Sequence, residues 1–149
     1  MASYANYALD YSTIGLCPLP VKNKQPLISG FNRWRGLSNQ SIETISKRFP
    51  EASLSILTRL SGLVVVDIDS KDADLVAWVI DECGYTPIIV KTKKGFHLYY
   101  SNSDGSIKGS IRQGNFPIDV KANGRSDYVV VPPSKGCLLY TSPSPRDRG

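Results

Sequence analysis

Cysteine, histidine and long apolar runs are all scarce in this chain of 149 residues. The three cysteines, Cys17, Cys83 and Cys137, form an odd and scattered set, which excludes a disulfide framework and a cysteine-rich metal site and favours a reducing compartment. No apolar run approaches the roughly 20 residues that cross a bilayer. The N-terminus also lacks the basic flank and apolar core of a secretion signal. We therefore expect a cytoplasmic protein that has no membrane partner.

The pattern of apolar and turn residues predicts a mixture of helices and strands. Helices are expected over 3–14, 41–49 and 72–83, where apolar residues recur at helical spacing. Strands are expected over 16–20, 54–58, 63–68, 87–90, 96–100, 118–121 and 128–131. Prolines in the first strand favour a position at a sheet edge, and 21–37 is expected to be a basic loop. No repeat or domain boundary interrupts this order, so we predict a single α+β domain.

The positive charge is concentrated in one part of the chain. Seven Lys and Arg residues but only two Asp residues lie between Lys91 and Arg125, so the whole net charge of +5 falls in that stretch. A basic field around clustered carboxylates suits a polyanion that also needs metal, such as a nucleotide or a nucleic acid. The alternative is a solvated basic face that has no partner.

Asp67 and Asp69 stand at the end of the apolar strand expected over 63–68. Strand side chains alternate, so both carboxylates point to the same face. At about 5 Å, two carboxylates repel by roughly 3 kcal/mol when the effective dielectric constant is near 20. Hard divalent cations are the obvious partners that offset such repulsion. The alternative is structural, with Asp69 capping the next helix and Asp67 at a solvated strand end.

The only histidine, His97, lies in a later strand directly after a Lys-Lys-Gly turn. The glycine of this turn permits a close backbone approach, and the lysines attract phosphate. A structural, hydrogen-bonded histidine is the alternative. A third carboxylate, Asp119, lies in another apolar strand and shares its face with Lys121, an arrangement that is equally typical of a plain ion pair.

The end of the chain has a different character. Residues 137–149 begin Cys-Leu-Leu-Tyr-Thr-Ser-Pro-Ser-Pro-Arg-Asp, which resembles the translated end of a transposon adapter used in sequencing libraries. The alternative is an ordinary Ser/Pro-rich disordered tail. We therefore expect a folded domain over 1–136 that is incomplete at its C-terminus, followed by a disordered segment over 137–149.

Taken together, an acidic pair, a basic turn with Gly-x-His and a third carboxylate with a basic neighbour resemble the catalytic domain of the archaeo-eukaryotic primase superfamily. The resemblance is to the bifunctional DNA primase/polymerase N-terminal domain of plasmids, phages and mobile elements, from about residue 5 to 134. The matching segments are 65–69, 94–100, 118–121, 124, 128–134 and an N-terminal signature at Pro18-Leu19-Pro20, Lys24-Gln25-Pro26 and Trp34. The chain departs from the pattern at Arg59, where relatives more often carry glycine, and in a slightly long loop at 125–127.

This resemblance implies a primase/polymerase catalytic domain whose core sheet is like that of an RNA-recognition motif, preceded by an N-terminal α/β unit. Asp67, Asp69 and Asp119 would bind two divalent ions, Mg²⁺ or Mn²⁺, and would form the catalytic set with His97. The residues that would contact the nucleoside triphosphate or the template are His97, Lys94, Lys121 and Lys24. The implied activity is template-directed nucleotidyl transfer in DNA replication, with a DNA template and primer and a fused or separate helicase as partners.

Two other functions remain open from the sequence. A non-catalytic single-stranded nucleic-acid binding module would explain the basic stretch and would use Phe96, Tyr99 and Tyr100 as stacking platforms, but it leaves the carboxylates unexplained. An aspartate-nucleophile phosphotransferase of the haloacid dehalogenase type also has an apolar strand that ends in Asp-x-Asp. In that family Gly-Thr follows, whereas here Ser70-Lys71 does.

Overall fold

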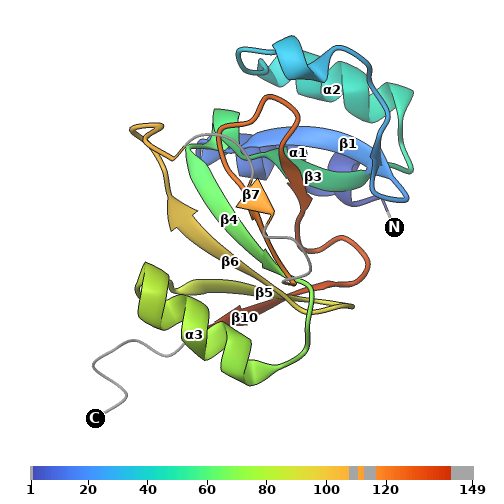
Figure 1. The fold of residues 1–149 in the computed structure, drawn as a ribbon. Helices are drawn as coiled ribbons and strands as arrows, with labels where there is room; N and C mark the ends of the chain where they lie inside the picture. Colours follow the sequence, from blue (N-terminus) through green and yellow to red (C-terminus); the bar gives the residue numbers. More distant parts are fainter. Residues whose placement is uncertain (1, 108–110, 113–116, 142–149) are drawn as a thin grey trace.

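Two antiparallel β-sheets and three α-helices form the described part of the chain in a computed structural model, which covers residues 2–107, 111–112 and 117–141 (Figure 1). The fold is of the α+β class, as predicted. Within the described ranges, none of the helices combines the length and the apolar character needed to span a bilayer.

The first sheet belongs mainly to the N-terminal half of the chain. It contains four strands in the order β2-β1-β3-β9. Their bounds are β1 Cys17–Lys22, β2 Gln25–Pro26, β3 Ser53–Leu57 and β9 Tyr128–Val130. Helix α1 (Ser3–Thr13) packs on β1 and β3, and α2 (Asn39–Arg48) packs on α1. These elements form the predicted N-terminal α/β unit, which β9 joins from the far end of the sequence.

The prediction that the first strand lies at a sheet edge is wrong in part. β1 pairs with β3 along Cys17–Val21 and also pairs with β2 on its other side, at Val21 and Lys22. Because β2 is only two residues long, the two prolines of β1 still face no strand on that second side within the described residues. The expected loop over 21–37 therefore begins with a short hairpin and also contains a 3-10 helix over Phe31–Arg33.

The second sheet carries the residues of chemical interest. Its order is β10-β5-β6-β4-β8-β7. The bounds are β4 Leu63–Ile68, β5 Ile88–Thr92, β6 Phe96–Ser101, β7 Ile111–Arg112, β8 Ile118–Lys121 and β10 Cys137–Thr141. Helix α3 (Ala73–Cys83) connects β4 to β5 and covers one face of the sheet. The central order β5-β6-β4-β8 with this crossover helix is that of an RNA-recognition motif, which confirms the predicted core sheet.

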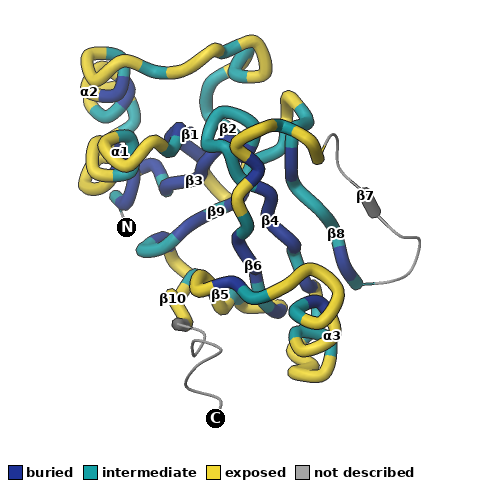
Figure 2. Tube along the Cα trace, turned by 90° about the vertical axis from the view of Figure 1, so that its left-hand side faces the viewer, coloured by how far each residue is buried: buried dark blue, intermediate teal, exposed yellow. Residues whose placement is uncertain are grey.

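Helix α3 begins and ends where its sequence indicates. The Asp72 carboxylate accepts a hydrogen bond from the Asp74 N–H at 2.9 Å, so it caps the helix, and Gly84 follows the last turn with φ +96°. Val79 is buried against the sheet together with the partly buried Leu75 and Ile80. Figure 2 shows the outcome: β4 and β6 are buried through the middle of the molecule, while the outer side of α3 is exposed.

Among the described residues, strands that follow one another in the sequence belong to different sheets at three places, β3 to β4, β8 to β9 and β9 to β10, and the first two of these crossings lie in contact. The chain leaves β3 for β4 through Thr58–Gly62, and it leaves β8 for β9 through Ala122–Asp127. Thr58 joins the two crossings, because its hydroxyl donates to the Ala122 carbonyl at 2.6 Å and its N–H donates to the Asp127 carbonyl at 3.2 Å. The turn at Arg59 needs no glycine there, since Gly62 supplies the left-handed residue.

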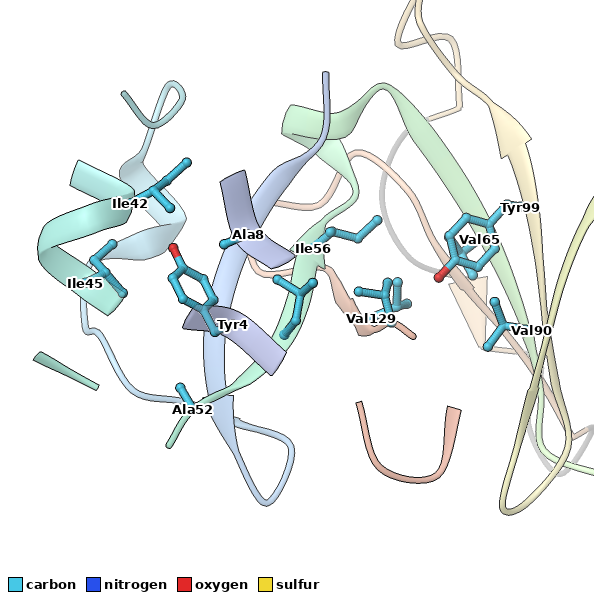
Figure 3. Close-up of a cluster of buried hydrophobic side chains, with 12 residues drawn as sticks. Tyr4, Ala8, Ile42, Ile45, Ala52, Ile56, Val65, Val90, Tyr99 and Val129 are labelled. Carbon is cyan, nitrogen blue, oxygen red and sulfur yellow. The ribbon is translucent and has the colours of Figure 1, made fainter. Parts of the chain in front are cut away.

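A continuous core joins the two sheets. Figure 3 shows Val129 of β9 between Ile56 of β3 and a group on the second sheet that consists of Val65, Val90 and Tyr99. The same cluster extends to Tyr4 of α1 and to α2. The face of the second sheet opposite to α3 is therefore covered by the first sheet, over part of its length.

The end of the described chain differs from the predicted disorder. Cys137–Thr141 forms β10, which pairs with β5 in an antiparallel register that sets Leu139 opposite Val90. A short run of apolar residues meets the free edge of β5 here, and edge strands readily accept such a partner. Residues 142–149 of the predicted tail lie outside the described residues, and the adapter origin of the segment stays a prediction.

Candidate functional site

The register of the second sheet places three predicted site residues side by side. β4 lies between β6 and β8, and Asp67 is directly opposite His97 on one side and Asp119 on the other. Residues that are directly opposite in an antiparallel pair share a face and have Cβ atoms about 5 Å apart. The predicted common face of these residues is therefore present in the structure. Register also places Arg112 of β7 opposite Asp119.

Asp69 lies just beyond the C-terminal end of β4. Its N–H donates to the Pro117 carbonyl at 2.8 Å, which continues the pairing of β4 and β8 past the last strand residue. The side chain of Asp69 is exposed, while that of Asp67 is about one-third exposed. Position 69 is two residues after Asp67, so both carboxylates belong to the face that bears His97 and Asp119.

Each of the two half-buried carboxylates has a basic neighbour. The His97 Nε2 atom lies 3.4 Å from Asp67 Oδ1, and Lys121 Nζ lies 3.0 Å from Asp119 Oδ2. The Lys121 ammonium offsets part of the repulsion between Asp67 and Asp119, which is about 3 kcal/mol at 5 Å for an effective dielectric constant of 20. His97 itself is buried, and its Nδ1 atom has no hydrogen-bond partner among the described residues.

Gly95 sets the position of the basic turn between β5 and β6. A Cβ atom at this residue would lie 1.9 Å from the Ile68 carbonyl oxygen and 2.6 Å from that of Ser70. The turn therefore rests directly on the backbone on either side of Asp69. It is held by a pair of hydrogen bonds between Thr92 and Gly95. Any side chain at position 95 would push Lys94 and His97 away from the acids.

A hairpin of the first sheet contributes residues to the site opposite the carboxylates of the second sheet. Asn23 and Lys24 form the two-residue turn between β1 and β2, with φ values of 51° and 65°. Both residues of a type I′ hairpin turn need positive φ, which usually selects Asn followed by Gly. Lys24 occupies the glycine position, and its carbonyl accepts a hydrogen bond from the Tyr128 hydroxyl at 2.7 Å.

These elements enclose a cleft of about 820 Å³ between the two sheets. All seven predicted site residues line it, from both sheets: Lys24, Asp67, Asp69, Lys94, His97, Asp119 and Lys121. Five lysines contribute to its walls, because Lys93 and Lys135 also lie there. The cleft thus combines a carboxylate face with a rim of cations, and its size is typical of a small-molecule site.

Among the other lining residues, Lys93, Lys135 and Tyr128 could contact a ligand but were not selected as site residues from the sequence. Lys93 lies one residue before a selected lysine, and its side chain packs against Gly136, at 3.4 Å from where a Cβ would stand. Lys135 follows the buried Ser134, whose hydroxyl hydrogen-bonds to Ser3 and to the Leu54 backbone. Tyr128 begins β9. For Lys135 the only available signal was its place two residues after the Pro132-Pro133 pair that ends a predicted strand.

The carboxylates line one cleft but are not gathered around a point. Among residues 2–107, 111–112 and 117–141, no group of three or more His, Cys, Asp or Glu side chains lies close enough to hold a metal ion. The donor chemistry nevertheless fits a hard divalent cation, since Asp67, Asp69 and Asp119 present carboxylate oxygens from one face. In the present arrangement Asp119 faces Lys121 instead.

The titratable groups near the apolar end of the same face are uncharged near neutral pH. Tyr99 lies two residues after His97 and is buried against the first sheet, and burial raises the pKa of its hydroxyl. Burial also raises the pKa of the Cys17 thiol in β1 to about 11. Both groups therefore remain protonated near neutral pH.

The sequence was also compared with known proteins. Residues 6–142 match the family profile for the Prim-Pol domain, described as "Bifunctional DNA primase/polymerase, N-terminal". No curated protein matches the chain closely enough to count as a relative. The matched range includes the whole of the cleft described above.

Proposed function

Because this chain belongs to the family of bifunctional DNA primase/polymerase N-terminal domains, we propose that it joins nucleoside triphosphates to a primer under the direction of a DNA template. The family supports nucleotidyl transfer of the primase/polymerase type. The proposal adds a role in the replication of a plasmid, phage or mobile element. The observation that supports it best is the shared face of Asp67, Asp69, Asp119 and His97 within one lysine-rimmed cleft.

In the proposed reaction the 3′ oxygen of the primer forms a bond to the α-phosphorus of the triphosphate. The bond between the α-phosphorus and its bridging oxygen breaks, and pyrophosphate leaves. Asp67, Asp69 and Asp119 would hold two divalent ions, Mg²⁺ or Mn²⁺. Such ions, when bound, favour loss of the 3′-hydroxyl proton and neutralise charge on the phosphates.

The remaining residues bind and orient the substrate in this proposal. Lys94 and His97 lie on and directly after the turn that Gly95 holds against the Asp69 backbone, so they face a triphosphate placed over the acids. Lys121 lies beside Asp119 and would turn to phosphate once that carboxylate binds a cation. Lys24 approaches from the hairpin of the other sheet.

The proposal is tested by primer extension with Mg²⁺ or Mn²⁺. We expect Asp67→Asn and Asp119→Asn to reduce extension by more than about 100-fold, since each removes a charge where transition-state charge is neutralised. Asp81→Asn is the matched control, because Asp81 is exposed on α3 and does not line the cleft. Unchanged extension in both site variants would refute the assignment.

Two other results would select the alternatives. A wild-type chain that binds single-stranded DNA but incorporates no nucleotide with either metal would favour a binding module. Release of phosphate from small phosphoesters, lost in Asp67→Asn, would favour an aspartate-nucleophile phosphotransferase.

A further inference from the structure

A second positively charged surface lies mostly outside the cleft, on the end of β1 and the segment that connects it to α2. Residues 21–37 contain Lys22, Lys24, Arg33 and Arg35 and no acidic residue. All four side chains are exposed, and Arg125 from the β8–β9 loop adds a fifth exposed cation. Among the described residues there are two ion pairs, and both involve carboxylates of the cleft. Neither of these two pairs includes any of the five cations.

Specific contacts hold this surface in a defined shape. The Tyr128 hydroxyl donates to the Lys24 carbonyl at 2.7 Å, and the Phe31 and Tyr128 rings meet edge to face with centroids 6.2 Å apart. The Arg59 guanidinium donates to the Trp34 carbonyl at 3.0 Å. Arg125 reaches the Asn32 carbonyl at 3.5 Å. The 3-10 helix and the hairpin are thus tied to β9 and to the crossings between the sheets.

The backbone at Lys24 indicates that its position matters. A non-glycine residue in the left-handed region costs about 1–2 kcal/mol, and here a lysine bears that cost at φ 65°. Lys24 is also the one member of the five that lines the cleft within the described part of the chain. Through Tyr128, which contacts both Lys24 and Phe31, it links the cleft to the segment that carries Arg33 and Arg35.

We propose that Lys22, Lys24, Arg33, Arg35 and Arg125, together with the rings of Phe31 and Tyr128, form a platform that binds the single-stranded template as it leaves the cleft. This inference rests on the proposed function, because the template is the polyanion that such a cleft would have to admit. Four of the five cations lie outside the cleft, so one nucleoside triphosphate held there does not account for them.

The rings favour a single strand over a duplex. Phe31 and Tyr128 are each only partly buried, and they lie among the cations. An unpaired base can stack on an aromatic ring, which contributes about 1–3 kcal/mol per base. Bases in a duplex are already stacked on one another and offer only their edges.

The platform is tested by the binding of a fluorescent single-stranded 20-mer across a range of salt concentrations. We expect the Arg33→Glu/Arg35→Glu double variant to bind at least about tenfold more weakly than wild type at low salt. The negative slope of log K against log salt should become shallower by about 1.4, as the loss of two phosphate contacts predicts. Lys47→Glu/Arg48→Glu on α2 has the same charge change and should bind within about twofold of wild type; both residues are exposed.

Three further measurements separate the platform from the cleft. Binding of a fluorescent nucleoside triphosphate should be unchanged in Arg33→Glu/Arg35→Glu, whereas equal loss of nucleotide and DNA binding would overturn the separation. Phe31→Leu keeps an apolar side chain but removes the ring, and it should weaken single-strand binding about five- to tenfold. Equal binding of duplex and single strand, unaffected by Phe31→Leu, would overturn the single-strand assignment.

Failure of this inference is distinguishable from failure of the proposed function. If the charge-reversed platform binds DNA as well as its α2 control does, the platform is wrong even when Asp67→Asn abolishes extension. A different result is a wild type that extends no primer but binds DNA, with that binding lost in the platform variants and not in the α2 control. In that case the platform stands and the polymerase assignment fails.

Discussion

Replacement of Gly95 by alanine is a sharp test of how the site is built. The added Cβ would lie 1.9 Å from the Ile68 oxygen, and ordinary contact begins near 3.4 Å, so the turn must retreat by about 1.5 Å. The nearest obstructing atom belongs to Ile68 of β4, whose backbone is paired with strands on both sides and cannot rotate away. Overpacking of this kind costs about 1–3 kcal/mol of unfolding free energy. A displacement near 1 Å at a reacting centre lowers turnover about 100-fold.

The two effects can be separated by measuring thermal unfolding and primer extension on the same samples. Gly84→Ala is the control, because position 84 also resists a side chain, with φ +96°, but nothing lies within 4 Å of its Cβ. We expect both variants to unfold at lower temperature and only Gly95→Ala to lose extension and nucleotide affinity. If folded Gly95→Ala extends primers within about threefold of Gly84→Ala, the turn does not position the site.

Three more outcomes are expected. Millimolar Mn²⁺ should raise the unfolding temperature of the wild type but not that of Asp119→Asn. A ligand at 100 times its Kd adds about 2.7 kcal/mol to the free energy of unfolding. Equal shifts in the two proteins would place the ion elsewhere. Between pH 9 and 11 the Cys17 thiol should contribute a fall in unfolding free energy of about 1.4 kcal/mol per pH unit, because this buried thiol, with its pKa raised to about 11, holds its proton when the unfolded chain has lost it. Buried tyrosines such as Tyr99 add to the fall above pH 10, since burial raises their pKa values too. Urea titrations of the wild type and of Cys17→Ala at each pH should differ by the Cys17 contribution. Ser134→Ala should lower the free energy of unfolding by about 1–3 kcal/mol, since the buried Ser134 hydroxyl forms hydrogen bonds to both Ser3 and Leu54. Ser126→Ala, in an exposed loop, should change the free energy of unfolding measured in urea by less than about 0.5 kcal/mol.

Local patterns in the sequence were enough to predict much of the second sheet. Strand alternation placed Asp67 and Asp69 on one face, and both residues line the same cleft, where Asp67 lies opposite His97 and Asp119. The helix predicted over 72–83 is present as α3, and its ends are set by Asp72 and Gly84, whose cap chemistry acts over a few residues. The roles of the cleft residues in metal and nucleotide binding stay predictions.

Pairings between distant segments could not be predicted from local patterns. Alternation says which face a residue occupies but not which strand lies beside it, so the separation of β3 from β4 into two sheets was not foreseen. The link through Thr58 has the same origin, because its partners Ala122 and Asp127 are more than 60 residues away. The pairing of β10 with β5 likewise depends on an open strand edge that only the folded sheet presents.

Val65 and Asp67 are separated by one residue of β4 and share a face, yet one lies in the hydrocarbon between the sheets and the other in the cleft. The packing of Val65 between the two sheets therefore fixes the position of the strand that carries Asp67. Random substitutions that abolish activity should consequently map to the sheet-to-sheet contact as often as to charged positions. Compensating changes for a shifted acid should be sought around Val129, on the opposite sheet, rather than among residues that could touch a substrate.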